Sequence, residues 1–171
     1  TIIGAVSPPG GDFSEPVTQH TKRFVRCFWA LDRNLANARH YPAISWIDSY
    51  SEYLEELAPW WEQHVTAEFL EDRREILELL QREVRLEQVV KLVGPDALPD
   101  SQRFVLDVCG LFKTAFLQQN AFDEIDRFST VEKQIKMLGI VLLYWRRGSE
   151  AIRRGVTLVN LRRVRVYQDM V

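Results

Sequence analysis

Two apolar stripes at helical spacing, separated by a short turn, constrain the fold of this chain more than any other feature. The first stripe consists of Ile76, Leu77, Leu80, Val84, Val89, Val90 and Val93, and the second of Phe104, Val105, Val108, Leu111 and Phe112. Gly94 and Pro95 separate them, because glycine readily adopts the conformation that ends a helix and proline cannot continue one. The sequence therefore predicts a helical hairpin whose turn is GPDALPD, at residues 94–100.

Further helices are predicted on both sides of the hairpin. A short helix is indicated at residues 49–57. Ser129 and Glu132 have the spacing of a capping box at the start of another helix, which Gly155 closes. From Ser49 onward we therefore expect an antiparallel helical bundle, and we expect the fold to be mainly α.

The N-terminal segment combines an apolar run with a stiff, acidic loop. The run IIGAV at 2–6 has the composition of a buried strand, and it leads into SPPGGDFSEP at 7–16, where proline and glycine fix the backbone. Because an unpaired strand edge is unfavourable, we expect residues 1–6 to be irregular or to pair with another copy. We also expect the chain to be part of a longer one.

A helix is predicted after Pro16. It would carry the apolar stripe Phe24, Phe28, Leu31 and Leu35, with Thr18 or Thr21 as its N-cap. It would end at HYPA, residues 40–43, because the residue before a proline is driven out of the helical region.

The composition is that of an ordinary soluble protein, with 46% apolar residues, 27% charged residues and a net charge of −2 over 171 residues. Such a near-neutral chain argues against a dedicated nucleic-acid binder. The most apolar run, MLGIVLLYW at 137–145, is too short to span a membrane. Cys27 and Cys109 lie in apolar patterns without a second metal ligand nearby, so we expect buried thiols in a reducing, cytosolic compartment.

Charge is segregated along the chain. Residues 48–72 hold eight acidic residues and no lysine or arginine, whereas residues 133–165 hold nine lysines and arginines and one acidic residue. One interpretation is two solvated faces that attract each other within the bundle. The other is that the basic end binds an acidic partner or a nucleic acid, although a basic platform interleaved with aromatic residues is absent. The sequence is compatible with both.

Motifs that carry chemistry are absent from the sequence. It contains neither of the phosphate-binding patterns GxxxxGK[ST] and GxGxxG, and no GxSxG nucleophile elbow. His20, His40 and His64 are not at metal-ligand spacing from one another or from a cysteine. We therefore predict no catalytic residue and no metal site within these residues.

Four longer blocks are more specific than these patterns. In chain order they are IIGAVSPPGGDFSEPVT, FWALDRNLANARHYPAISWIDSYS, LVGPDALP and FLQQNAFDEID. Their order and spacing resemble the C-terminal third of the catalytic A subunit of V/A-type rotary ATP synthases. The resemblance implies that residues 1–48 are the end of an α/β nucleotide-binding domain, a short strand and loop remnant, and that residues 49–171 are the C-terminal helical bundle.

The resemblance implies two kinds of site residue. The adenine ring would pack on Tyr41, in a pocket completed by Gln119, Asn120 and Phe122. Contacts to the central rotating stalk would come from Asp12, Ser14 and Glu15 in the N-terminal loop and from Asp96, Leu98 and Asp100 in the hairpin turn. From the residues alone, without the family resemblance, Glu15 is interpreted as an acidic residue near a helix N-terminus. The turn at residues 94–100 is then an ordinary connection between helices.

For the whole catalytic protein, the resemblance implies ATP or ADP with Mg²⁺ as cofactors, and ATP synthesis or hydrolysis coupled to transport of H⁺ or Na⁺. The implied partners are the central-stalk subunits and the non-catalytic B subunit, in a cytoplasmic sector peripheral to the membrane, without nucleic acid and without membrane insertion. Because the phosphate loop and the catalytic carboxylate lie outside these residues, we expect the isolated chain to be inactive and without a cofactor. The alternatives are a freestanding helical adaptor that binds no nucleotide and a nucleic-acid binder using the arginine-rich end.

Overall fold

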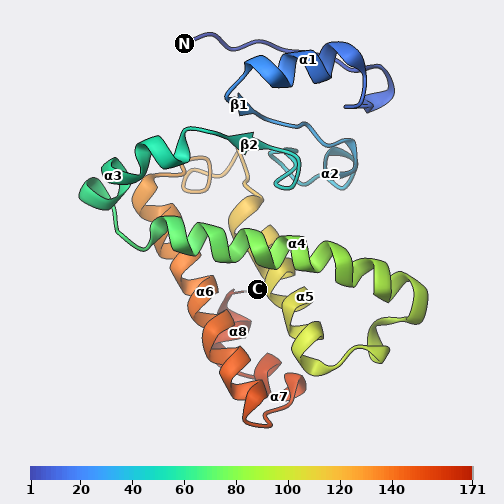
Figure 1. Ribbon diagram of the computed structural model, residues 1–171. Helices are drawn as coiled ribbons and strands as arrows, with labels where there is room; N and C mark the ends of the chain where they lie inside the picture. The colour runs from blue at the N-terminus through green and yellow to red at the C-terminus, as the bar shows by residue number, and fades with distance from the viewer. Residues whose placement is uncertain (171) are drawn as a thin grey trace. The chain divides into compact units, whose positions relative to one another are not determined.

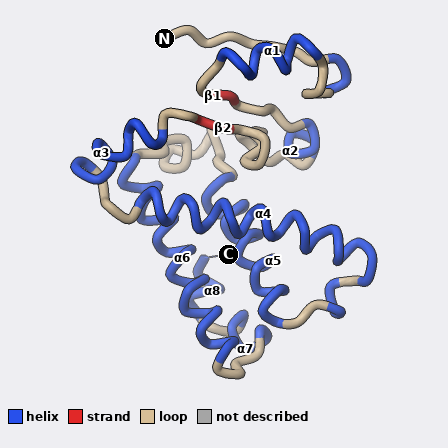
Figure 2. The backbone as a smooth tube through the Cα atoms, in the orientation of Figure 1, coloured by secondary structure: helices blue, strands red, loops and turns tan. Residues whose placement is uncertain are grey.

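The computed structural model describes residues 1–170, and these form two compact units, Thr1–Pro59 and Trp60 onward (Figure 1). Helices dominate, and within the described residues the strands are limited to one short pair in the first unit (Figure 2). The prediction of a mainly α fold is confirmed. Among residues 1–170, no helix combines the length and the apolar character that a membrane span requires.

The first unit is built from short elements. They are a 3₁₀ turn at Pro9–Gly11, then α1 (Pro16–Phe24), β1 (Cys27–Phe28), α2 (Arg33–Asn37), β2 (Tyr50–Ser51) and the first part of α3 (Leu54–His64). Residues 1–8 have no regular secondary structure, so the apolar run is irregular rather than a strand, which is one of the two outcomes expected for it. The two strands are antiparallel, and Cys27 lies opposite Ser51.

The single helix predicted from Phe24 to Leu35 is wrong. Glu15, rather than a threonine, caps α1, and the helix ends at Phe24 because Val25 is extended. Phe24 and Leu31, which the spacing places on one buried stripe, are 84% and 73% exposed. The chain after α1 pairs instead with β2, so contact with a distant segment overrides the local apolar spacing.

Aromatic packing around Phe28 holds the first unit together. The Phe28 ring meets Phe13 edge to face and stacks on Tyr50, with a centroid distance of 5.9 Å in each case. The hydroxyl of Tyr50 donates to the carbonyl of Lys22 over 2.8 Å, which ties β2 to α1. Strand alternation turns Phe28 inward and Cys27 outward, so the expectation that the Cys27 thiol is buried is wrong.

The second unit contains the predicted helical hairpin and the helices around it. Its elements are the rest of α3, then α4 (Phe69–Val93), α5 (Asp100–Phe112), α6 (Val131–Arg153), α7 (Leu158–Arg162) and α8 (Arg165–Met170). A 3₁₀ turn at Pro95–Ala97 joins α4 to α5, and a π-helical turn at Lys113–Leu117 follows α5. Gly94 and Gly155 close α4 and α6 with φ angles of 82° and 91°, as the sequence predicts.

Two helix boundaries differ from the prediction. The short helix expected at 49–57 begins only at Leu54 and continues to His64. At the start of α6, Thr130 replaces Ser129 as the cap, because its hydroxyl accepts from the N–H of Lys133. The predicted capping box does not form there, since the carboxylate of Glu132 instead pairs with a lysine one turn further along the helix.

Close contact between α5 and α6 forms the core of the second unit, where the two helices run side by side in opposite directions (Figure 1). Phe104 of α5 is completely buried, and its ring stacks on Trp145 of α6 with centroids 5.5 Å apart. Gly148 on α6 permits this approach, because a Cβ atom at that position would overlap the Phe104 ring. The absence of a side chain at position 148 therefore sets the distance between the two helices.

A buried ion pair links α4 to the π-helical turn. Glu83 is 4% exposed, and its carboxylate lies 2.6 Å from Nζ of Lys113. Burial raises the pKa of the Glu83 carboxyl, and the hydrogen bond from Lys113 acts in the opposite direction. Cys109 is buried, as predicted, and burial raises the pKa of its thiol to about 12, so the thiol is protonated at neutral pH.

The segregated charges meet within the second unit at Arg146. Its Nη2 atom on α6 lies 2.6 Å from the carboxylate of Asp72 and 2.5 Å from that of Glu75, both on α4. Only Asp72 belongs to the acidic segment 48–72, so this one contact agrees with the interpretation of the charged segments as faces that attract each other. The Arg146 side chain is 52% exposed, so the contacts add little to stability.

Candidate functional site

The loop at residues 118–130, between the π-helical turn and α6, carries three of the four residues that the resemblance implies for adenine binding. These are Gln119, Asn120 and Phe122. Phe122 is 98% exposed, and Ile125 and Phe128 in the same loop are 79% and 60% exposed. An aromatic ring that projects into solvent in this way is available for stacking on a flat partner.

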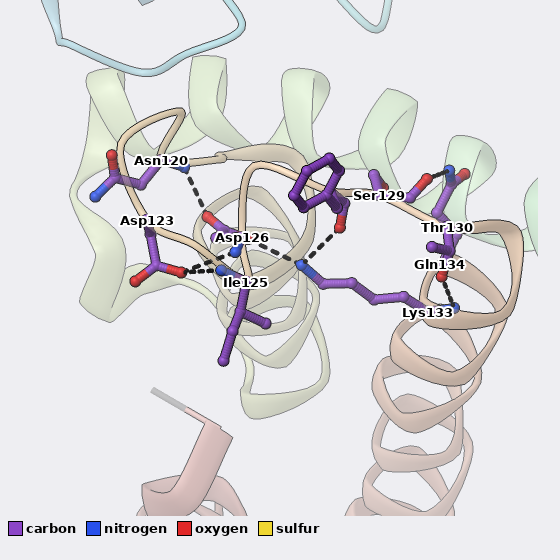
Figure 3. A network of polar contacts seen from close by, with 9 residues as sticks. Asn120, Asp123, Ile125, Asp126, Ser129, Thr130, Lys133 and Gln134 are labelled. Atoms are coloured by element: carbon purple, nitrogen blue, oxygen red, sulfur yellow. Dashed lines mark hydrogen bonds and ion pairs between the residues drawn. The ribbon is translucent and has the colours of Figure 1, made fainter.

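Hydrogen bonds from side chains to the backbone fix the course of the 118–130 loop (Figure 3). The Oδ1 atom of Asn120 accepts from the N–H of Phe122 at 3.0 Å. The Oδ1 atom of Asp123 accepts from the N–H groups of Ile125 and Asp126 at 2.9 and 2.8 Å. Short-range bonds of this kind are typical of Asn and Asp in turns, and here they give the loop a defined shape.

Asp126 connects the start of the loop to α6 (Figure 3). Its Oδ2 atom accepts from the N–H of Asn120 at 2.6 Å, and its Oδ1 atom lies 3.1 Å from Nζ of Lys133. The same Nζ donates to the carbonyl of Phe128 over 3.4 Å. The bond from Asn120, followed by that from Lys133, lowers the pKa of the Asp126 carboxyl, so this group is ionised at neutral pH.

Tyr41, the fourth of these residues, lies in the first unit, in the turn that follows α2. Its side chain is 53% exposed, and its peptide bond to Pro42 is cis. The N–H of Asp32 donates to the carbonyl of Ala43 over 2.9 Å, which closes the turn at its base. The ring is therefore carried on a fixed backbone with much of its surface accessible. The four residues belong to different units.

The acidic N-terminal loop uses its polar side chains within itself. The Oδ1 atom of Asp12 accepts from the N–H and the hydroxyl of Ser14, at 2.9 and 2.6 Å. The carboxylate of Glu15 accepts from the N–H groups of Val17 and Thr18, at 3.0 and 2.9 Å, and so caps α1. Bonds from Ser14 lower the pKa of Asp12, and those from Thr18 and Val17 lower the pKa of Glu15. Glu15 thus has the structural role expected of an acid at a helix N-terminus.

Asp96, Leu98 and Asp100 in the hairpin turn have three different surroundings. The Asp96 side chain is 94% exposed and lies 3.7 Å from Nη2 of Arg103. Leu98 is only 7% exposed and belongs to the core. The Oδ2 atom of Asp100 accepts from the N–H of Leu158 over 2.9 Å, and so caps α7. Of the three, Asp96 is the residue whose side chain is mostly exposed.

Replacing Asp100 by alanine is expected to lower the free energy of unfolding by about 1 kcal/mol, because α7 loses its cap. Asp96→Ala is the matched control, since its exposed carboxylate should contribute within about 0.5 kcal/mol. Urea unfolding of the two variants measures the difference. Equal midpoints would mean that the Asp100 contact does not stabilise the fold.

Comparison with known protein families matches both units of the chain. The family described as the C-terminal domain of V and A type ATP synthase matches residues 58–161, more than half of the chain. The chain belongs to this family. The nucleotide-binding domain of the ATP synthase alpha/beta family matches residues 1–51.

Relatives from V-type and A-type ATP synthases align along the whole chain. The V-type ATP synthase alpha chain of Halothermothrix orenii is 50% identical over 171 residues, which are 100% of this chain and 29% of that protein. The A subunit of the A-type ATP synthase of Hyperthermus butylicus is 51% identical over 162 residues, which are 95% of this chain and 27% of that protein. The resemblance stated from the sequence is confirmed, and the chain spans less than a third of the length of these relatives.

The fold of this V and A type domain also occurs in a solved structure, described as the structure of a unique ATP synthase subunit NeqB from Nanoarcheaum equitans. The TM-score is 0.66 at 17% sequence identity, and the alignment covers 80% of this chain and 32% of that chain. At this identity the likeness concerns the fold alone.

Two side chains that hold the 118–130 loop of this ATP synthase domain were not singled out from the sequence. Asp126 lies in the block FLQQNAFDEID, and Lys133 lies in the first turn of α6. Neither belongs to a motif with its own chemistry. An aspartate and a lysine 7 residues apart do not by themselves predict an ion pair. The pair forms because the loop folds back onto the helix.

Proposed function

We propose that this chain is the C-terminal part of a catalytic A subunit, and that it contributes to adenine binding and to rotor contact in a V/A-type ATP synthase or ATPase. The observation that carries the proposal is the 50% identity to the V-type ATP synthase alpha chain over all 171 residues. The complete protein would bind ATP or ADP with Mg²⁺ and couple synthesis or hydrolysis to H⁺ or Na⁺ transport. Its partners would be the central stalk and the B subunit, in a cytoplasmic sector peripheral to the membrane.

Two exposed aromatic residues, Tyr41 and Phe122, support the proposed adenine binding. Tyr41 is 53% exposed and Phe122 is 98% exposed, and a flat exposed ring favours stacking on a purine. Gln119 and Asn120 would supply amide groups for the ring nitrogens. Because Oδ1 of Asn120 already accepts from the N–H of Phe122, its Nδ2 group is the part that can face an acceptor on the base.

The proposed rotor contacts rest on exposed polar groups at two places. Asp12 and Ser14 are exposed in the N-terminal loop, and Asp96 is exposed in the hairpin turn. Exposed charges make weak contacts, which suits a partner that must be released as it turns. The other three residues would support these segments from within: Glu15 and Asp100 as helix caps, and Leu98 as part of the core.

Tyr41→Ala, introduced into the complete A subunit of the assembled complex, is expected to raise the KM for ATP about tenfold, because stacking on the base is lost. Tyr41→Phe keeps the ring and should remain within about twofold of the wild type. Steady-state ATP hydrolysis measures both, and the isolated 171-residue chain should show no turnover. A KM that Tyr41→Ala leaves unchanged would remove the adenine role of this residue.

A further inference from the structure

The 118–130 loop lacks the apolar packing that holds most protein segments in place. Phe122, Ile125 and Phe128 are its large apolar side chains, and each is at least 60% exposed. Fixing a loop reduces its conformational entropy, so other contacts must offset that loss. The polar contacts of the loop therefore decide how Phe122 is presented.

Asp126 contacts both the start of the loop and the helix α6 that follows it (Figure 3). One carboxylate oxygen accepts from the N–H of Asn120 at 2.6 Å, and the other lies 3.1 Å from Nζ of Lys133. Because the two contacts use different oxygens, they can exist together. The side chains of Lys133 and Asp126 are 25% and 36% exposed, so their attraction is less screened than that of a fully exposed pair.

We propose that Asp126 is a positioning residue for nucleotide binding, because its contacts with Lys133 and with the Asn120 backbone set the direction in which Phe122 projects. This inference rests on the proposed adenine site. The side chain of Asn120 links Asp126 to Phe122, since its Oδ1 atom accepts from the N–H of Phe122 at 3.0 Å. Asp126 and Lys133 thus influence the base through the loop and do not touch the base themselves.

The test measures ATP hydrolysis by the assembled complex whose complete A subunit carries Asp126→Ala, Asp126→Asn or Lys133→Met. Asp126→Ala is expected to raise the KM for ATP about tenfold and to change kcat less than about twofold, because binding of the base is weakened equally in the ground state and the transition state. Asp126→Asn keeps an amide oxygen for the Asn120 N–H, so it should recover most of the affinity. The KM for ATP of Lys133→Met should lie between those of Asp126→Ala and Asp126→Asn.

Lys136→Met is the matched control. Lys136 lies on the same helix and pairs with Glu132 at 2.6 Å, and both side chains are at least 70% exposed. It should change neither KM nor kcat. Hydrogen exchange of the peptide at 118–128 in the same complexes gives a readout independent of activity, and it should be faster in Asp126→Ala and unaltered in Lys136→Met.

Phe122→Ala and Tyr41→Ala in the same series separate this inference from the proposed function. If both raise the KM and Asp126→Ala does not, the positioning role is wrong and the adenine site stands. If neither raises the KM, the adenine site fails, and the positioning role fails with it. A lower kcat for Asp126→Ala at an unchanged KM would also overturn the inference, because it would indicate a general structural role.

Discussion

Replacing Glu83 by alanine is expected to lower the free energy of unfolding by about 3 kcal/mol, because one charge of a buried ion pair is removed. The ammonium of Lys113, whose side chain is 23% exposed, would lose a carboxylate that lies 2.6 Å away. Glu87, 3.7 Å from the same Nζ atom, would offset part of that loss. Urea unfolding of the 171-residue chain, followed by circular dichroism, measures the effect.

The double variant Glu83→Met/Lys113→Met is the control for this result. It removes both charges and retains similar volume, so its stability should lie within about 1 kcal/mol of the wild type or above it. A double variant as unstable as Glu83→Ala would instead show that packing, and not a charge left behind, is responsible.

The same carboxyl gives the stability a dependence on pH. Burial raises the pKa of Glu83 above its ordinary value of 4.5, so the folded chain binds this proton more tightly than the unfolded chain does. Its contribution is therefore fully present below about pH 4.5 and is lost as the pH rises through the raised pKa. Glu83→Gln does not titrate. The stability of the wild type relative to this variant should decrease as the pH rises above about 4.5 and through the raised pKa.

Gly148→Ala is expected to lower the free energy of unfolding by about 2 to 3 kcal/mol, because it overpacks the contact between α5 and α6. The added Cβ atom would lie 2.7 Å from Cε1 of Phe104 and closer still to Cζ. The Phe104 side chain is completely buried, so its ring can give way only by repacking within the core. Thermal unfolding of the purified variant measures the loss.

Gly139→Ala is the matched control on the same helix. Nothing lies within 4 Å of a Cβ atom at that position. Alanine there should raise the free energy of unfolding by about 0.5 to 1 kcal/mol, because glycine is a poor helix residue. The same substitution is thus expected to have opposite signs at the two sites, and an equally stable Gly148→Ala variant would contradict the close contact.

The helical hairpin was predictable because its signals are local. Gly94 and Gly155 end their helices through their own backbone conformation, and Pro99 stands immediately before α5. The residues that α4 buries were less predictable. Val84 and Val89 are 40% and 42% exposed, whereas the helix buries Ile76, Leu79, Leu80, Glu83 and Leu86. A carboxylate can occupy the core only because a lysine from a distant turn meets it, and spacing along one helix does not reveal that partner.

The candidate site was predictable only as far as the four blocks of the family resemblance reach. They point to Tyr41 and to the loop that carries Phe122. The roles of Leu98 in the core and of Asp100 as the cap of α7 were not predictable. Each role depends on contacts with segments far away in the sequence. The Asp100 contact with Leu158, for example, joins residues 58 positions apart.

That contact also suggests an order in which the second unit assembles. The connection between α4 and α5 is short, so closing the hairpin removes little chain entropy. Packing of α5 against α6 closes the longer 118–130 loop and so removes more chain entropy. The contact of Asp100 with α7 closes a loop of 58 residues. We therefore expect the hairpin to form early and the docking of α7 to come last. The C-terminal turns should then be the first part of the unit to open when the folded chain fluctuates.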